Sequence, residues 1–126
     1  MGTDSEFLHK EPSETIIGCA MRVLNALKPG LDEKIYERAL VIALRKPGRI
    51  TEQQCVFPVF FEGERIGALI PDLIVSGQVI ADPKVVSEFN ESHIARMIGH
   101  LSITGLRVAL LLDFRYAQLR WKRIVR

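Results

Sequence analysis

Two short stretches, Pro71-Asp72 and Asp82-Pro83-Lys84, bring two acids and a lysine close together along the chain. Carboxylates are the hard oxygen ligands that Mg²⁺ prefers, with waters and substrate phosphate completing its coordination. A divalent metal held in this way activates a water and neutralises charge around a phosphodiester under attack. A lysine beside the metal can orient the water and offset developing charge. These residue types therefore indicate the chemistry of phosphodiester hydrolysis.

The two acids lie on either side of Ser76-Gly77-Gln78, the predicted turn of a β-hairpin. Side chains alternate between the faces of a strand, so the turn length decides whether the acids meet. A two-residue turn would put Asp72 and Asp82 on opposite faces. A three-residue turn, which pairs Val75 with Val79, sets the acids directly opposite each other, and its glycine suits a left-handed backbone. The site hypothesis requires this second register; a plain solvated hairpin is the alternative.

Periodicity and turn residues predict the elements that position these groups. Apolar residues at helical spacing predict a helix that begins near Glu11-Pro12-Ser13, with Ser13 able to cap it, and a second helix over 32–44. Strands are then expected over 53–61, 65–70, 72–75 and 79–86, a helix over 90–104, and strands over 106–114 and 119–125. The order ααββββαββ predicts an α/β (α+β) fold with helices flanking a central mixed β-sheet.

Length and composition indicate one folded domain. The chain has 126 residues, 48% hydrophobic and 25% charged, which predicts a single domain over 13–126 after a flexible or cloning-derived lead over 1–12. Neither a signal peptide nor an apolar run of membrane-spanning length is evident, so we expect no membrane partner and a cytoplasmic protein. Two cysteines without CxxC spacing predict no zinc site.

Charge is unevenly distributed, although the formal net charge is only +2. From Arg115 onward the chain has five basic residues and no acidic one. This pattern is typical of a solvated terminal strand, and equally of an edge that contacts phosphate. The sequence leaves both interpretations open.

The segment from Gly30 to Tyr36, GLDEKIY, has the form GxxExxY. With Glu37-Arg38-Ala39-Leu40, the late run 105–111 and the ending 122–125, it resembles the family named after that motif. The resemblance extends from about Ser13 to the C-terminus. That family is similar in predicted fold to the PD-(D/E)XK nuclease superfamily, which implies a restriction-endonuclease-like mixed sheet flanked by helices.

The resemblance implies a role for each matching residue. Asp72 would be the metal-binding acid, and Asp82 the second acid, with the carbonyl of Pro83 as an extra ligand. Lys84 would be the catalytic lysine. Glu33, on the second helix, would be the auxiliary acid, the alternative being an exposed residue paired with a neighbouring base. The implied cofactor is Mg²⁺ or Mn²⁺, and Tyr36 would lie beside the site.

The chain departs from the family pattern at the second acid. The family usually has Glu-Leu-Lys where this chain has Asp82-Pro83-Lys84. Aspartate reaches about one methylene less far than glutamate. On an interior strand Pro83 would lose a ladder hydrogen bond or require a local bulge.

The following helix departs as well. Where the family has H-x-x-Q-x-x-x-Y, this chain has His93, Arg96 and His100, which share one helical face. Arg96 is expected either to contact phosphate or to pair with Asp82 and block the site. His100 is expected to be a structural histidine rather than a ligand.

The leading hypothesis is therefore a metal-dependent nuclease acting on nucleic acid. The alternative is a catalytically inactive descendant that binds nucleic acid through Arg96, Arg120, Lys122 and Arg123. A third hypothesis is a protein-interaction module, for which the apolar segment 56–61 would supply a homodimer surface.

Overall fold

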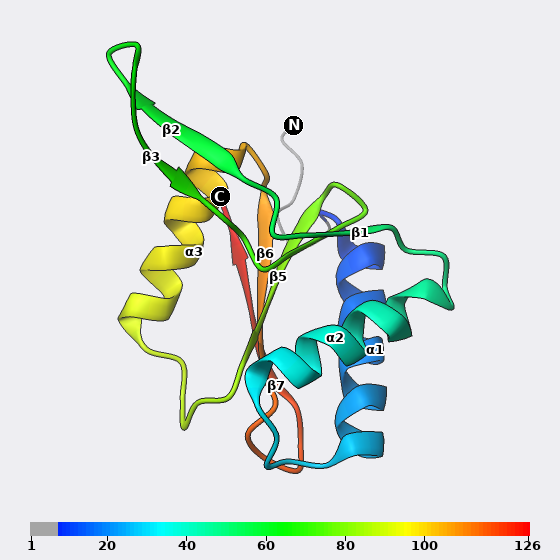
Figure 1. Cartoon of the computed structure of the whole chain (residues 1–126). Helices are drawn as coiled ribbons and strands as arrows, with labels where there is room; N and C mark the ends of the chain where they lie inside the picture. The colour runs from blue at the N-terminus through cyan, green and yellow to red at the C-terminus, as the bar shows by residue number, and fades with distance from the viewer. Residues whose placement is uncertain (1–7) are drawn as a thin grey trace.

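A computed structural model describes residues 8–126 as a β-sheet with helices on both faces (Figure 1). The central sheet has the strand order β1-β4-β5-β6-β7, in which only β5 and β6 are parallel. This confirms the predicted central mixed sheet flanked by helices. The elements are α1 (Lys10–Leu27), α2 (Glu33–Arg45), β1 (Thr51–Gln53), β2 (Phe57–Phe61), β3 (Glu64–Leu69), β4 (Leu73–Val75), β5 (Val79–Lys84), α3 (Glu91–Thr104), β6 (Val108–Asp113) and β7 (Arg120–Val125).

Two apolar cores fill the two sides of the sheet, because successive strand residues point to opposite faces. In β5, Val79 and Ala81 belong to the core beneath α1 and α2, whereas Ile80 belongs to the core beneath α3. Continuing this alternation along the strand places Asp82 and Lys84 on the α3 face. The residue between them, Pro83, points to the other face.

The hairpin of β4 and β5 has the three-residue register that the site hypothesis requires. Val75 pairs with Val79 and Leu73 with Ala81, so one further step along both strands sets Asp72 opposite Asp82. Ser76 and Gly77 have φ values of 54° and 64°, and the left-handed conformation of the turn is therefore shared by two residues.

Pro83 neither interrupts the sheet nor causes a bulge. The β5–β6 register continues through Pro83, which pairs with Leu112, to Lys84, which pairs with Asp113. On the other side of β5, the pairing with β4 extends only to Ala81. The missing N–H of proline is tolerated here because β5 has no partner on that side at this point.

The structure has one strand more than the sequence indicated between α2 and α3. Gln54, whose φ of 56° turns the chain, separates two strands here. Before it lies β1 of the central sheet, of which Gln53 alone falls within the strand predicted over 53–61, and after it lies β2, which pairs with β3 among the described strands. This two-stranded hairpin projects past the end of α3 (Figure 1).

The first helix begins earlier than predicted. Lys10 is its first residue, and Ser13 lies buried inside it, so Ser13 is not the cap that the sequence suggested. Of the expected lead over 1–12, residues 1–7 lie outside the described part of the chain. Within the described part, no helix is both long and apolar enough to cross a bilayer, and Cys19 and Cys55 are both free thiols.

Candidate metal-binding site

Three carboxylates from three different elements meet at one point. Asp72 immediately precedes β4, Asp82 lies in β5, and Glu33 is the first residue of α2. One oxygen from each lies within 4.8 Å of the others. Glu33 and Asp72 are partly exposed, whereas Asp82 is only 2% exposed. The cluster therefore joins a buried anion to two that solvent can reach.

Glu33 reaches the cluster from the opposite layer. The buried side chains of α2 pack into the core on the α1–α2 face of the sheet, whereas Asp82 points to the α3 face. Because β4 pairs with β5 only as far as Ala81, the edge of β5 is uncovered beside Asp82. The short length of β4 thus leaves the gap in which groups from both layers can meet.

Tyr36 holds the chain that leads into α2. Its hydroxyl donates to Lys28 O at 2.6 Å and accepts from Leu31 N at 3.2 Å. Its fully buried ring stacks on Phe114, with ring centroids 4.7 Å apart. Tyr36 is thus a core residue that positions the start of α2, and hence Glu33, instead of facing the cluster.

Lys84 forms an ion pair with Asp82 beside the cluster. The Nζ–Oδ2 distance is 3.3 Å, and Lys84 is 9% exposed. Burial is the main cause that raises the pKa of Asp82 to about 7, and a hydrogen bond to Asp72 raises it further, whereas the Lys84 cation lowers it. Ionising Asp82 is therefore costly unless another cation is present.

The residues present fit a divalent cation. Oδ1 of Asp82 is buried and has no hydrogen-bond partner among the described residues. The other two acids offer oxygens within a few ångströms of it. Hard oxygen ligands of this kind suit Mg²⁺, Mn²⁺ or Ca²⁺, and a cation would also relieve the repulsion between the converging carboxylates.

Helix α3 places His100 and Arg96 over the same face of the sheet. His100 is 6% exposed, and its Nε2 accepts a hydrogen bond from Nε of Arg96 at 3.5 Å. Burial is the first cause that lowers the pKa of His100; Arg96 and Lys84 also lower it, and Asp72 raises it. Among residues 8–126, the ion pair of Asp82 is with Lys84, not Arg96. The blocking contact considered for Arg96 is not formed.

His93 has a local role at the start of α3. Its backbone N–H donates to the Asn90 side chain at 3.0 Å, and its Nδ1 accepts from the Asn90 N–H at 3.1 Å. This reciprocal capping box stabilises the first turn of the helix. His93 therefore fixes where α3 begins, and with it the placement of Arg96 and His100.

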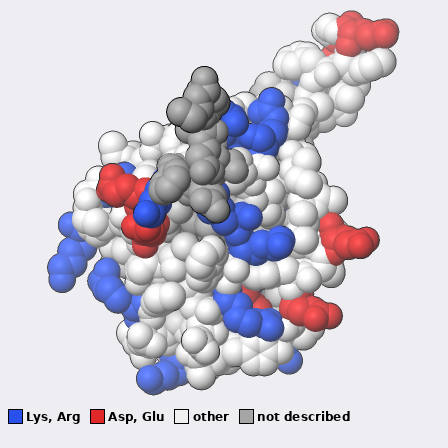
Figure 2. All heavy atoms as spheres, turned by 180° about the vertical axis from the view of Figure 1, so that it is seen from behind, with Lys and Arg blue, Asp and Glu red and all other residues white. Residues whose placement is uncertain are grey.

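The basic residues of β7 divide between the two faces of the sheet. Lys122 is exposed and pairs with Leu111, which pairs in turn with Asp82, so Lys122 lies two strands from the acid, about 10 Å at usual strand spacing. Arg120 binds Asp113 at 2.8 Å and the carbonyl of Ser87. Figure 2 shows basic side chains on the face seen from behind and acidic ones at the end of the projecting hairpin.

The remaining strand arginine is bound within the protein. Arg123 donates to the carbonyl of Leu8, beside the first turn of α1. Three β7 side chains were proposed from the sequence to contact nucleic acid. Among them, Lys122 is the one that forms no ion pair or hydrogen bond with a described residue.

Two buried acids were not identified from the sequence. Glu37, 3% exposed, binds Lys34 at 3.4 Å and Gln53 at 3.2 Å. Asp113, 1% exposed, accepts from the backbone of Val86 and so holds the chain that leaves β5. The spacing of Glu37 four residues after Glu33 places both on one helical face, which is a signal that could have identified it.

The chain matches a family model described as PD-(D/E)XK nuclease superfamily over residues 10–124. No curated protein matches the chain. Two crystal structures of an alkaline exonuclease (LHK-Exo) from Laribacter hongkongensis, one in complex with dAMP, are each 14% identical to it. Each match covers 90% of this chain and 82% of the other, with TM-scores of 0.48 and 0.49. These values are too low to say anything about the chemistry of this chain.

Proposed function

Because the chain belongs to the PD-(D/E)XK nuclease superfamily, we propose that it is a metal-dependent nuclease that hydrolyses phosphodiester bonds in nucleic acid. One observation supports the proposal above all others. Oxygens of Glu33, Asp72 and Asp82 lie within 4.8 Å of one another, and Lys84 Nζ is 3.3 Å from the most buried of these acids. Three acids and a lysine are the groups that this hydrolysis needs.

In this proposal Glu33, Asp72 and Asp82 hold Mg²⁺ or Mn²⁺, and the carbonyl of Pro83 is an additional oxygen available to the ion. When bound, such an ion polarises a phosphate oxygen and lowers the pKa of a coordinated water. The partly exposed positions of Asp72 and Glu33 leave the cluster open to an incoming phosphate.

Lys84 has two tasks that follow from its position. Its cation favours the ionised form of Asp82, which is the form that binds metal. Its Nζ also provides hydrogen-bond donors that orient a water and stabilise negative charge as it develops on the phosphate. Burial strengthens both effects because water screens the charge less.

Arg96 and Lys122 are the side chains proposed to contact the nucleic-acid backbone. Both are exposed, and Arg96 uses only Nε to bind His100, so the two terminal nitrogens of its guanidinium remain for a phosphate. His100, whose pKa is lowered by burial and by Arg96, accepts the hydrogen bond that fixes the direction of Arg96. Arg120 and Arg123 are already bound within the protein and have a smaller part.

The direct test is cleavage of labelled DNA and RNA with Mn²⁺ or Mg²⁺. We expect cleavage that stops in EDTA and falls at least about 100-fold in Asp82→Asn and in Lys84→Met, as for removal of a preorganised catalytic group. Circular dichroism of each variant checks the fold. Absence of cleavage with both metals, or cleavage by both variants at the rate of the wild-type protein, would exclude the proposal.

The same proteins discriminate the non-catalytic alternative. Nucleic-acid binding that survives EDTA and weakens steeply with salt, without any cleavage, would assign the fold a binding role through phosphate contacts. The salt slope should then decrease by about one for each of Arg96→Gln and Lys122→Gln.

The projecting hairpin favours self-association as a second role. Phe60, Phe61 and Ile66 are 59%, 62% and 67% exposed, and β2 and β3 pair only with each other. A two-stranded hairpin gains stability from further partners. Light scattering should show a dimer that Phe60→Ser with Ile66→Ser converts to a monomer; a monomeric wild type would exclude this role.

A further inference from the structure

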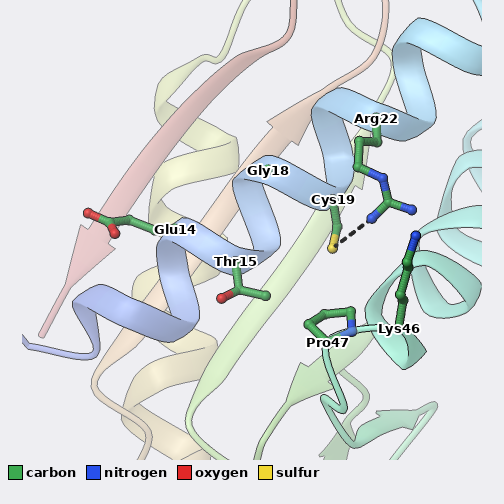
Figure 3. A pocket seen from close by; sticks show the side chains of 7 residues that line it. All are labelled: Glu14, Thr15, Gly18, Cys19, Arg22, Lys46 and Pro47. Carbon is green, nitrogen blue, oxygen red and sulfur yellow. Dashed lines mark hydrogen bonds between the residues drawn. The ribbon is translucent and has the colours of Figure 1, made fainter.

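A pocket lies on the outer side of α1, beside the residue that caps the end of α2 (Figure 3). Its volume is about 420 Å³, within the usual range for small-molecule sites. Thr15, Gly18, Cys19 and Arg22 of α1 line one side, and Lys46 and Pro47 the other. Lys46 and Glu33 lie at opposite ends of α2, about 20 Å apart at 1.5 Å per helical residue. The pocket is therefore separate from the metal-binding site.

Two cations converge at one end of this pocket. Figure 3 shows the side chains of Arg22 and Lys46 pointing toward one another. Neither forms an ion pair with a carboxylate of the described residues, and the hydrogen-bond acceptor of Arg22 is the sulfur of Cys19 at 3.8 Å, a weak partner. Lys46 is favoured by its place at a helix C-terminus, but that does not account for Arg22 beside it.

The anionic groups near the pocket are neutralised or directed elsewhere. Glu14 points away from the two cations (Figure 3) and forms an ion pair with Lys10 at 3.9 Å. Burial raises the pKa of the Cys19 thiol, so a neutral thiol faces the pocket, and it donates to Ala43 O. The local charge at this end of the pocket is therefore positive.

Gly18 lines the pocket without a side chain that would fill it. It lies in the middle of α1, where glycine weakens a helix relative to alanine. A Cβ built at Gly18 would meet nothing within 4 Å, so packing within the described protein does not require glycine here. Its φ is not positive either. The missing side chain keeps open a space that the protein itself does not fill.

We propose that this pocket binds a phosphate group, held between Arg22 and Lys46, with the rest of the ligand lying over Gly18 and against Pro47. The flat fork of a guanidinium and the point charge of an ammonium together suit a phosphate dianion or diester. The group can come from a free phosphomonoester of nucleotide size or from the backbone of a nucleic-acid strand. The proposed phosphate site is separate from the metal-binding site, and the proposal does not depend on phosphodiester hydrolysis there.

The test is NMR of the ¹⁵N-labelled, metal-free protein in EDTA. The protein is titrated with inorganic phosphate, with AMP, with adenosine and with a thymidine octanucleotide that has no terminal phosphate. We expect the amides of Gly18, Cys19 and Lys46 to shift with AMP and not with adenosine. Shifts with AMP and phosphate would assign a free phosphoester; shifts with the octanucleotide alone would assign a nucleic-acid strand. Absence of shifts at these amides with every probe would overturn the proposal. Shifts confined to residues near Asp82 would overturn it too.

Matched variants separate binding from stability. Arg22→Gln and Lys46→Gln should each weaken binding of the active probe about tenfold, the effect of losing a charge-assisted hydrogen bond. Gly18→Ala should raise the Tm, because alanine favours the helix, and yet weaken binding. Gly99→Ala is the control, since Gly99 also lies inside a helix with open space around it. It should raise the Tm and leave binding unchanged. Equal binding by Arg22→Gln, Lys46→Gln and wild type would refute the assignment.

Discussion

Lys84 Nζ lies 3.3 Å from Asp82 Oδ2, and both side chains are almost completely buried. The two residues are two positions apart on β5, so the alternation of the strand alone puts them on one face. A buried pair of this kind is retained only if its remaining polar atoms also find partners. The buried Oδ1 of Asp82 has none among the described residues, and the proposed metal would be the partner that it lacks.

Replacing Lys84 by methionine should separate catalysis from metal binding. The variant keeps the bulk of the side chain but loses the cation, so we expect single-turnover cleavage to fall at least about 100-fold. Mn²⁺ should still bind, with an affinity reduced because Asp82 ionises less readily. Electron paramagnetic resonance measures the binding. Lys122→Met is the matched control on the same face, and should raise KM with kcat unchanged.

The raised pKa of Asp82 predicts how stability depends on pH. In the metal-free protein this pKa is about 7, against an ordinary value of 3.8. Between these values the folded state binds more protons than the unfolded state, so the unfolding free energy should fall as pH rises from about 4 to about 7 and then level off. Urea unfolding in EDTA across this range measures the effect. The decline should be absent in Asp82→Asn, and an equal decline in both proteins would contradict the assignment.

Metal binding should have the opposite pH dependence. A proton on Asp82 competes with the cation, so the affinity for Mn²⁺ should rise with pH until the carboxyl is ionised near pH 7. Calorimetry at several pH values, in buffers of different ionisation enthalpy, would also detect the released proton. A flat affinity between pH 5.5 and about 7.5 would show that Asp82 is not a ligand.

Glu33 and Glu37, one helical turn apart, should respond differently to the same change. Glu33 is partly exposed at the cluster, so Glu33→Gln should lower Mn²⁺ affinity and leave thermal stability nearly unchanged. Glu37 is buried against Lys34 and Gln53, so Glu37→Gln should destabilise the fold by about 1–3 kcal/mol. Thermal denaturation and Mn²⁺ titration are measured on both variants, and each variant is the control for the other. If Glu37→Gln lowered the Mn²⁺ affinity and Glu33→Gln lowered the thermal stability, the roles assigned to the two residues would be wrong.

The Tyr36 hydroxyl should affect the metal site through the backbone. Tyr36→Phe keeps the ring that stacks on Phe114 but removes the bridge from Lys28 O to Leu31 N. We expect a loss of about 1–2 kcal/mol in unfolding free energy. Because the bridge holds the entry to α2, Mn²⁺ affinity should also fall by a smaller factor than in Glu33→Gln. Phe114→Leu, which perturbs the stacking alone, tests whether general loosening has the same effect.

Local patterns were sufficient to predict most elements, but they left two registers open for the critical hairpin. Gly77 suited the left-handed backbone of a three-residue turn, and the structure confirms the pairing of Val75 with Val79 that the site hypothesis required. Local patterns failed where the backbone took an unexpected conformation. Gln54 turns the chain with a positive φ, which glutamine rarely adopts, so the strand predicted over 53–61 is shortened to β2, and β1, which was not predicted, precedes the turn.

The burial of charged side chains was harder to predict, because it depends on which elements pack together. The contacts of Arg120 depend on Asp113, a partner on the adjacent strand, and those of Arg123 depend on the carbonyl of Leu8, beside the first turn of α1. Glu37 is nearly inaccessible, although glutamate side chains are usually exposed. None of these outcomes follows from the neighbours of a residue along the chain.

By itself, the sequence determined that Asp82 and Lys84 share a face, because a strand alternates with a period of two, and that Asp72 could join them. Only the tertiary structure decided that Glu33 completes the cluster. Its oxygen reaches the pair because β4 begins only at Leu73 and leaves the edge of β5 uncovered beside Asp82. Whether two layers of a fold meet at such an edge depends on strand lengths and helix packing, which are properties of the whole molecule.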